Sequence, residues 1–177
     1  MMNRALGGAF EARLNMNLRE DKGWSYGSRT SISGGEGPRQ FQVRAPVQTD
    51  ATKAALEELR RELTEVVGSN PATPEELEKV QTNAVLGLSS RWETGAAVGA
   101  SLAGIVTYDF PEDYFQTYAD SLRAVTLDDV RLAGQEIIPD QNLVWVIVGD
   151  LSKIEDDVRS VGLGDVTVVD EQGNVLR

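Results

Sequence analysis

The stretch LREDKGWSYG, residues 18–27, marks the point where the periodicity of the sequence changes from helical to extended. Before it, apolar residues recur at every fourth position, which predicts one apolar face of a helix. These residues are Met2, Leu6, Phe10, Leu14 and Leu18. Gly23 predicts the C-terminal end of that helix, because glycine readily takes the left-handed conformation of a helix stop. After Gly23, alternate residues up to position 33 predict a strand.

Two groups of glycines interrupt these patterns. Gly7 and Gly8 disfavour a continuous helix by about 2 kcal/mol relative to alanine, so they predict a break or a kink, or else a very close neighbouring backbone. Residues 34–38, GGEGP, predict a turn, and apolar and polar residues alternate again from 40 to 45. Together the two alternating stretches predict a β-hairpin.

The sequence is helical in character from Asp50 for about ninety residues. Thr73-Pro74-Glu75-Glu76 predicts a helix start with a capping box, and Thr126 with Asp129 predicts another. The small residues at 96–104 predict a helix that neighbouring backbones approach closely. The aromatic residues at 114–118 are expected to lie in the core.

The segment LVWVIV, residues 143–148, is uninterrupted apolar sequence, which is typical of a strand buried on both faces in the middle of a sheet. A helix around 154–161 and a short strand around 166–169 follow it. We therefore predict an α+β fold: a two-layer sandwich with a mostly antiparallel sheet and helices packed on one face. Residues 1–177 are expected to form a single domain, and the apolar periodicity that begins without a capping residue suggests an N-terminally truncated one.

Composition excludes many kinds of site. The 177 residues are 41% apolar and 25% charged, which is ordinary for a globular domain. The chain has no cysteine and no histidine, which excludes disulfides, thiolate chemistry, the Ser-His-Asp triad and the usual zinc ligand sets within it. A net charge of −11 argues against nucleic acid or an anionic membrane as partner. No apolar run is long enough to span a bilayer, and the sequence assigns no compartment; the bacterial periplasm and the cytoplasm both fit.

The charge is distributed unevenly along the chain. Residues 1–44 contain seven Lys or Arg and four acidic residues, so this segment is net positive. Residues 45–177 are therefore more negative than the net charge of −11 of the whole chain. Two explanations stand: an acidic, solvated layer of helices, or an N-terminal segment that faces something polar or anionic.

Arg19 and Tyr26 are the candidate site residues that remain after these exclusions. A chain reversal at Gly23 would bring both side chains into one space beside the hairpin. Both groups donate hydrogen bonds, so they can hold carbonyl oxygens or stabilise an oxyanion without transferring a proton. The alternative is structural, with Arg19 paired to Glu20 or Asp21 and Tyr26 packed with its hydroxyl in water.

The sequence resembles a known family in four stretches that occur in the family's order: LGGAFEARLNMNLREDKGWSYG, TPEELEKV, VTLDDV and VWVIVGD. It is similar to the C-terminal, non-catalytic half of the pitrilysin/insulinase family of zinc peptidases, relatives of the mitochondrial processing peptidase. The resemblance implies two similar halves around a cavity, one of which carries zinc on an inverted H-x-x-E-H motif. This chain would then bind no metal itself, and zinc would belong to the complete enzyme.

By motif and spacing, the resemblance implies that Arg19 anchors a substrate carbonyl and that Tyr26 donates to the scissile carbonyl oxygen as it becomes tetrahedral. The implied partners are a catalytic half, in the same polypeptide or a separate subunit, and a peptide substrate. This chain alone, without a catalytic residue, is expected to be inactive. The chain departs from the family at Ala12, where serine is common. The alternative function is a non-enzymatic scaffold or assembly subunit of the same fold.

Overall fold

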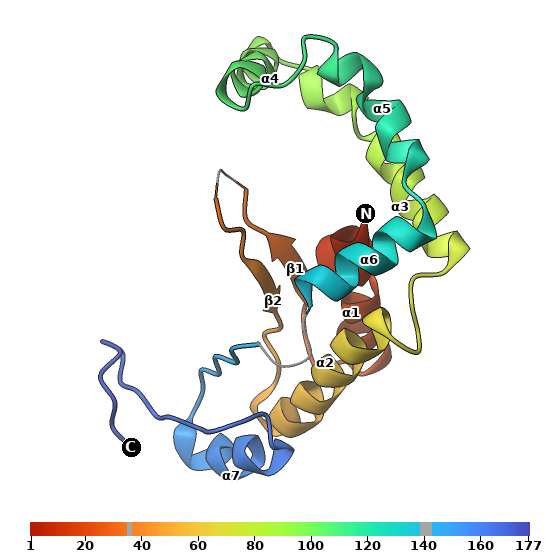
Figure 1. Cartoon of the computed structure of the whole chain (residues 1–177). Helices are drawn as coiled ribbons and strands as arrows, with labels where there is room; N and C mark the ends of the chain where they lie inside the picture. The colour runs from red at the N-terminus through yellow and green to blue at the C-terminus, as the bar shows by residue number, and fades with distance from the viewer. Residues whose placement is uncertain (35–36, 139–142) are drawn as a thin grey trace.

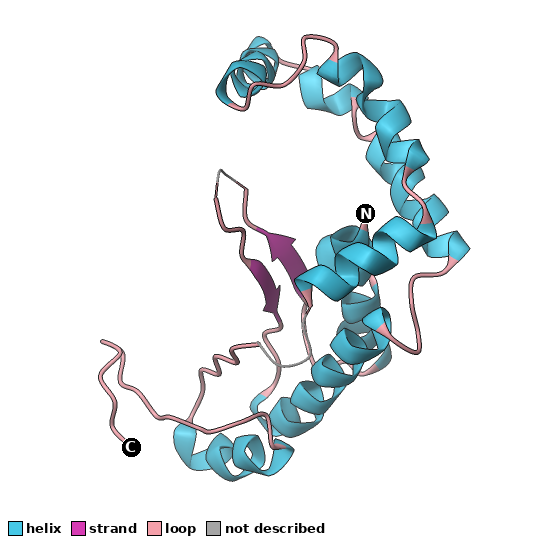
Figure 2. Ribbon diagram, in the orientation of Figure 1, coloured by secondary structure: helices cyan, strands magenta, loops and turns pink. Residues whose placement is uncertain are grey.

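The computed structural model describes residues 1–34, 37–138 and 143–177, and helices dominate it. Helix accounts for 57% of the chain and strand for 7% (Figure 2). The helical elements are η1 (Arg4–Gly8), α1 (Arg13–Asn15), η2 (Met16–Asp21), η3 (Thr49–Ala51), α2 (Thr52–Val67), α3 (Pro74–Leu86), η4 (Ser89–Trp92), α4 (Gly95–Thr107), α5 (Tyr114–Ala124), α6 (Leu127–Ile137) and α7 (Leu151–Val161). The prediction of a sandwich built on a mostly antiparallel sheet was therefore wrong.

The sheet in the described residues consists of the predicted hairpin. Strand β1 (Arg29–Ile32) pairs antiparallel with β2 (Phe41–Arg44), with Thr30 opposite Val43. The predicted turn at 34–38 includes residues 35 and 36, which lie outside the described residues. The LVWVIV segment does not join this sheet, although it was predicted to be a central strand. Its sequence favours a strand, but strand pairing depends on a distant partner that local sequence does not specify.

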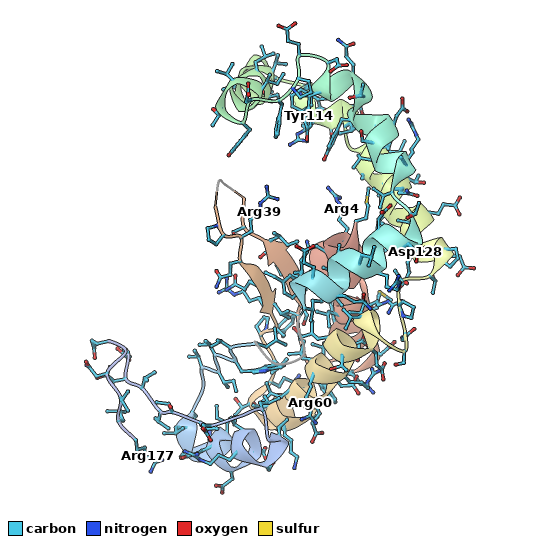
Figure 3. All side chains as sticks on the ribbon, viewed as in Figure 1. Arg4, Arg39, Arg60, Tyr114, Asp128 and Arg177 are labelled. Atoms are coloured by element: carbon cyan, nitrogen blue, oxygen red, sulfur yellow. The ribbon has the colours of Figure 1, made fainter. Side chains whose placement is uncertain are left out.

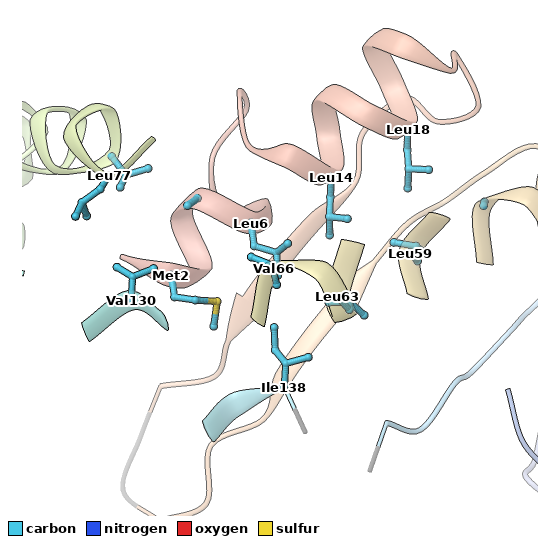
Figure 4. Packing of buried hydrophobic residues seen from close by; sticks show 13 residues of the cluster. Met2, Leu6, Leu14, Leu18, Leu59, Leu63, Val66, Leu77, Val130 and Ile138 are labelled. Carbon is cyan, nitrogen blue, oxygen red and sulfur yellow. The ribbon is translucent and has the colours of Figure 1, made fainter. Parts of the chain in front are cut away.

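The main core lies where the N-terminal segment meets α2. Its three most deeply buried large side chains are Leu6, Leu14 and Leu18. Figure 4 shows Leu14 and Leu18 projecting from the α1–η2 segment toward Leu63 and Leu59 of α2. The four-residue periodicity thus correctly predicted this apolar face, and each buried leucine contributes about 1.5–3 kcal/mol relative to an exposed one.

Phe10 is an exception to that periodicity, because its side chain is 63% exposed. The helix stops after Gly8, and Ala9 is extended with φ −127° and ψ 162°. Both predictions for the glycine pair are confirmed, since the helix breaks and a backbone also comes close. A Cβ added at Gly7 would lie 2.8 Å from the Thr30 backbone nitrogen. The break turns Phe10 outward.

The predicted helix starts are confirmed. Thr73 Oγ1 accepts from the Glu76 backbone N–H at 3.2 Å, and Glu76 Oε2 accepts from the Thr73 backbone N–H at 2.7 Å. Thr126 and Asp129 form the same reciprocal pair at the start of α6. These signals act within one helical turn, so they do not depend on the rest of the fold.

Residues 74–124 form an arm that extends from the body of the molecule (Figure 1). Helices α3 and α5 run side by side, and Gln81 Nε2 donates to the carbonyl oxygens of Leu122 and Val125 at 3.0 and 2.9 Å. Helix α4 lies at the far end. Figure 3 shows Tyr114 on this arm, away from the core.

Two predictions about the arm were wrong. The aromatic side chains of α5 are not in a core, because no described residue of α4 or α5 is buried. Tyr114 of α5 instead stacks on Phe110, which precedes the helix, with 4.3 Å between the ring centroids. No described neighbour approaches the glycines of α4 closely, since a Cβ added at Gly95, Gly99 or Gly104 would meet nothing within 4 Å.

Candidate functional site

Arg19 lies near the end of a helix of unusual geometry. The chain passes from α1 into the π-helix η2, which ends at Asp21. Helices of this kind are rare and occur frequently at functional sites. Gly23 then adopts φ +66°, and the Trp24 backbone N–H donates to the Leu18 carbonyl at 2.9 Å. The predicted helix stop and chain reversal are therefore confirmed.

The Arg19 guanidinium lies over an aromatic ring on the surface. Its Cζ atom is 4.7 Å from the centroid of the Phe10 ring. Its Nε atom is 3.4 Å from Glu20 Oε1, and both side chains are more than a third exposed. Among the described residues, the Arg19 side chain makes no hydrogen bond to a protein acceptor. Exposed ion pairs and exposed cation–π contacts each contribute only about 0–1 kcal/mol, so a ligand could compete for this guanidinium at little cost.

Tyr26 follows the reversal, and its side chain is fully exposed, at 100%. The backbone on either side of it is well fixed. Ser25 Oγ donates to the Pro46 carbonyl at 2.6 Å and accepts from the Gly27 backbone N–H at 3.1 Å. A large aromatic side chain that is wholly in water on a fixed backbone is available for contact with a ligand.

Asn15 links the segment that carries Arg19 to the segment that carries Tyr26. Sequence reasoning did not identify this residue. Its side chain is only 3% exposed. Nδ2 donates to the Phe10 carbonyl at 2.7 Å, and Oδ1 accepts from the Ser28 backbone N–H at 3.1 Å. One carboxamide therefore ties the loop that contains Tyr26 to the helix that contains Arg19. The sequence signal that could have identified Asn15 is a polar side chain directly beside Leu14, within the apolar periodicity of the predicted helix.

No hydrogen bond, ion pair or ring contact joins Arg19 directly to Tyr26 in the described part of the chain. The structural alternative for Arg19 was an ion pair with Glu20 or Asp21, and Arg19 does contact Glu20. The structural alternative for Tyr26 was a packed ring with its hydroxyl in water, and the ring is instead fully exposed. That both side chains enter one space stays a prediction. We use the name Arg19–Tyr26 surface for the exposed side chains of Phe10, Arg19 and Tyr26, whose segments Asn15 links by hydrogen bonds.

A polar hollow of about 440 Å³ lies on the body but includes neither Arg19 nor Tyr26. Its lining residues are Arg13, Met16, Asn17, Asp21, Lys22, Arg61, Glu62, Asn70, Thr73 and Glu76. Lining residues form ion pairs: Arg13 Nε lies 2.5 Å from Glu76 Oε1, and Arg61 Nη2 lies 2.6 Å from Oε2 of Glu58 beside the hollow.

Two carboxyl groups in or beside this hollow, those of Glu76 and Glu58, have lowered pKa values. Burial raises the pKa of Glu76, but hydrogen bonds from Arg13 and from the Thr73 backbone outweigh it and leave that pKa below its usual range. Hydrogen bonds from Arg61 and then Asn17 lower the pKa of Glu58. Arg13 pairs with Glu76 of α3, and Asn17 Nδ2 donates to Glu58 Oε2 and Glu62 Oε1 of α2, each at 2.8 Å. These contacts fasten α3 and α2 to the N-terminal segment.

The described residues do not fit a metal. They contain no group of three or more His, Cys, Asp or Glu side chains that could hold an ion. With no histidine or cysteine in the sequence, the zinc ligand sets of catalytic sites cannot form within this chain. Within the described ranges, no helix is both long enough and apolar enough to cross a membrane.

Comparison with known proteins finds similarity to one family over the N-terminal part of the chain. Residues 1–84 match the family model described as the peptidase M16 inactive domain. The resemblance predicted from the sequence is thereby confirmed over residues 1–84, which are similar to the inactive domain of the M16 peptidases. A search of curated proteins finds no match.

Solved structures show the same fold over three quarters of the chain. A peptidase M16 inactive domain from Pseudomonas fluorescens is 21% identical, with a TM-score of 0.67, and covers 76% of this chain and 32% of its own. A protein from Bordetella pertussis Tohama I, described as a candidate zinc protease, is 23% identical with a TM-score of 0.61 and covers 75% of this chain and 72% of its own. A protease from Helicobacter pylori is 15% identical with a TM-score of 0.57, covering 76% and 32%. This chain thus spans about a third of the first of these structures.

Proposed function

We propose that this chain is the substrate-binding, non-catalytic half of a zinc-dependent metalloendopeptidase. Residues 1–177 form one domain of that half, and its partner is a catalytic half that carries H-x-x-E-H, in the same polypeptide or as a separate subunit. The inactive-domain match supports the non-catalytic role. Zinc would be held by the H-x-x-E-H motif of the partner and, when bound, would supply an activated water and a Lewis acid for the scissile carbonyl.

The exposed side chains of Arg19 and Tyr26, on segments that Asn15 links, support this proposal. Arg19 offers a rigid fork of N–H groups to a substrate carbonyl, and the Phe10 ring beneath it limits the orientations of that fork. Tyr26 donates its phenolic O–H to the scissile carbonyl oxygen as negative charge develops there. Neither residue transfers a proton.

The test is peptide cleavage by this chain reconstituted with its H-x-x-E-H half. Tyr26→Phe removes the donor and keeps the ring, so kcat should fall about 10²-fold, the effect of one lost oxyanion donor. Arg19→Ala should mainly raise KM, because it removes contacts made before the transition state. The same measurements on Tyr118→Phe and Arg123→Ala, both on α5, should match the unchanged enzyme.

Cleavage that is unaffected by both Tyr26→Phe and Arg19→Ala would exclude these roles and favour the scaffold alternative. The isolated chain should cleave no peptide and bind no stoichiometric zinc, which metal analysis of the purified protein would check. If this chain alone bound one equivalent of zinc, the proposal that only the other half binds zinc would be contradicted.

A further inference from the structure

The hairpin of β1 and β2 (Figure 1) has one face on the body and one face open to solvent. Thr30 of β1 is 4% exposed, and its Oγ1 donates to the Asn3 carbonyl at 3.1 Å. Val43, opposite Thr30, packs against the main core. Because side chains alternate between the faces of a strand, the neighbouring Arg29 and Arg44 point outward, and both are exposed. Packing of the inner face therefore fixes the outer face in place.

Arg29 and Arg44, which we call the arginine pair, lie directly opposite each other on this outer face. The Cβ atoms of such cross-strand partners are about 4.5–5.5 Å apart, and like charges placed opposite each other destabilise a hairpin. Neither arginine forms an ion pair or a side-chain hydrogen bond with any residue in 1–34, 37–138 or 143–177, although the chain has 28 acidic side chains. Arg61 and Arg159, by contrast, pair with carboxylates at 2.6 and 2.9 Å. A local preference that is violated in this way is expected at a functional position.

The register of the hairpin places Tyr26 on the same outer face. Beyond the arginine pair, an isolated bridge joins Ser25 to Val47. Residues 26–28 therefore lie opposite only residues 45–46, which makes a β-bulge of one extra residue. Val47 packs against the core, so its partner Ser25 lies on the inner side and the next residue, Tyr26, lies on the outer side. Bulges beside functional sites redirect side chains in this way.

The arginine pair is only a short length of strand away from Tyr26. The steps of two or three residues between them correspond to about 7–10 Å, at about 3.3 Å per residue. An extended peptide covers that distance with two or three of its own residues. A peptide whose scissile carbonyl is held by Tyr26 can therefore place a nearby side chain on the pair. Guanidinium groups bind carboxylates through two parallel charge-assisted hydrogen bonds.

We propose that Arg29 and Arg44 form a subsite for the carboxylate of an Asp or Glu side chain, two or three residues from the scissile bond of a peptide substrate. The position of that side chain rests on the function proposed above, whereas the binding of a carboxylate does not. Ser31 and Gln42 are exposed partners on the same face, one step further along the hairpin. Their neutral side chains can hydrogen-bond the main chain of the bound peptide.

The charge of the molecule favours a single acidic side chain over a polyanion as the occupant. The whole chain carries −11, so a nucleic acid or a polyphosphate would meet net repulsion. Residues 1–44 are net positive, and the pair acts on a carboxylate in contact with it, well within the Debye length of about 8 Å at physiological ionic strength. The positive N-terminal segment then has a counterpart in the substrate.

Cleavage of matched peptides tests the position of the acidic side chain. The reconstituted peptidase receives a quenched fluorescent peptide with a single cleaved bond, in which Glu or Gln occupies in turn each of the three positions on either side. At one position two or three residues from the bond, Glu should raise kcat/KM about tenfold over Gln, the order expected for two solvent-exposed charge pairs. The gain should lie mainly in KM and should shrink in about 0.5 M NaCl.

Variants test whether the preference belongs to the pair. In the double variant Arg29→Gln with Arg44→Gln, the ratio of kcat/KM between the Glu and Gln peptides should fall to about one. Arg91→Ala, which removes an exposed arginine of η4, should keep the ratio of the unchanged enzyme. Arg29→Glu replaces like charges by opposite charges, so it should raise the melting temperature and still abolish the preference. A purely structural role of the pair would leave the ratio unchanged.

Binding is tested on this chain alone, without catalysis. The probe is the peptide acetyl-Ala-Ser-Glu-Ser-Ala-amide, and an NMR titration follows the Nε–H signals of Arg29 and Arg44. These signals should shift with the Glu probe and not with its Gln version at the same concentration. If inorganic phosphate saturates the shifts at a lower concentration than the Glu probe, the site is a phosphate site and the proposal is overturned. Shifts that grow with the concentration of the chain alone would indicate contact between copies and would overturn it too.

The subsite and the proposed function fail separately. If Tyr26→Phe and Arg19→Ala leave cleavage intact while the Glu probe still shifts the arginine signals, the proposed function fails and the carboxylate site stands. If cleavage depends on Tyr26 and Arg19 but the Glu and Gln peptides are cleaved equally well, the subsite fails and the proposed function stands. A preference for Glu that survives in the double Gln variant would exclude the arginine pair.

Discussion

Helices α2 and α4 lie in different surroundings. The more apolar of the two sequences, that of α4, belongs to the less buried helix. Helix α2 alternates leucines with charged residues, yet seven of its residues are buried. Helix α4 has no charged residue, yet none of its residues is buried in the described structure. The difference shows that an apolar stripe with a charged opposite face directs a helix onto a core, whereas small apolar residues on every side do not specify which face packs.

The largest expected effect is in the body. Leu14→Ala removes one of the three most deeply buried leucines, so the free energy of unfolding should fall by about 3 kcal/mol. Chemical denaturation measures it. A loss below about 1 kcal/mol would mean that the α1–α2 contact is not the stabilising core, and the contrast with the arm would disappear.

The next effect compares two glycines. Gly7→Ala places a Cβ 2.8 Å from the Thr30 backbone and should destabilise the body by about 1–3 kcal/mol through strain. Gly99→Ala, in the interior of α4, meets nothing within 4 Å and should instead stabilise by up to about 1 kcal/mol. Thermal denaturation of both variants should give shifts of opposite sign; shifts of the same sign would contradict the difference in packing.

A smaller effect concerns the junction of body and arm. Glu76→Gln keeps the capping box but loses the charge that pairs with Arg13, so stability at pH 7 should fall by about 1 kcal/mol. The folded-state pKa of Glu76 is lowered, so its contribution is present above the ordinary glutamate pKa of about 4.3 and is lost as pH falls through the folded value.

The melting temperatures of the wild type and of Glu76→Gln should therefore converge as the pH is lowered from 7 toward about 3. A difference that stays constant across that range would show that the ion pair contributes nothing to the junction.

The smallest effect is expected in the arm itself. Leu102 of α4 is 57% exposed, so Leu102→Ala should change the free energy of unfolding by less than about 0.5 kcal/mol. It is the matched control for Leu14→Ala, since the same atoms are removed. A loss comparable to that of Leu14→Ala would show that α4 is covered in solution.

Sequence reasoning succeeded where the determining contacts are local. Thr73 and Glu76 lie within one turn, and Gly23 acts through its own backbone, so their patterns predicted structure directly. The hairpin was likewise found because its strands adjoin in sequence. Leu14 and Leu18 were assigned to the core because helical periodicity identifies one face without a knowledge of what covers it.

The wrong predictions concern residues whose structure depends on contacts with parts of the chain that are distant in sequence. Residues 143–148 have a strand's sequence, but a sheet also requires a neighbour, and local composition could not supply one. Tyr114 was expected in the core because large aromatics are usually buried, yet the arm offers it mainly other aromatic rings. For the site, spacing singled out Arg19 and Tyr26. Phe10 was misassigned because a break predicted at Gly7 and Gly8 does not tell in which direction the chain leaves it. Asn15 was missed because its partners, the Phe10 carbonyl and the Ser28 amide, are set by that local fold.

The Asn15 carboxamide has a mechanical consequence for any peptide that engages this surface. Asn15 donates to the Phe10 carbonyl and accepts from the Ser28 backbone N–H. A force on Tyr26, two residues before Ser28, would therefore reach Phe10, the residue whose ring lies under Arg19. The two donors would then shift in concert when a bound chain moves, so their spacing would be kept while their position adjusts.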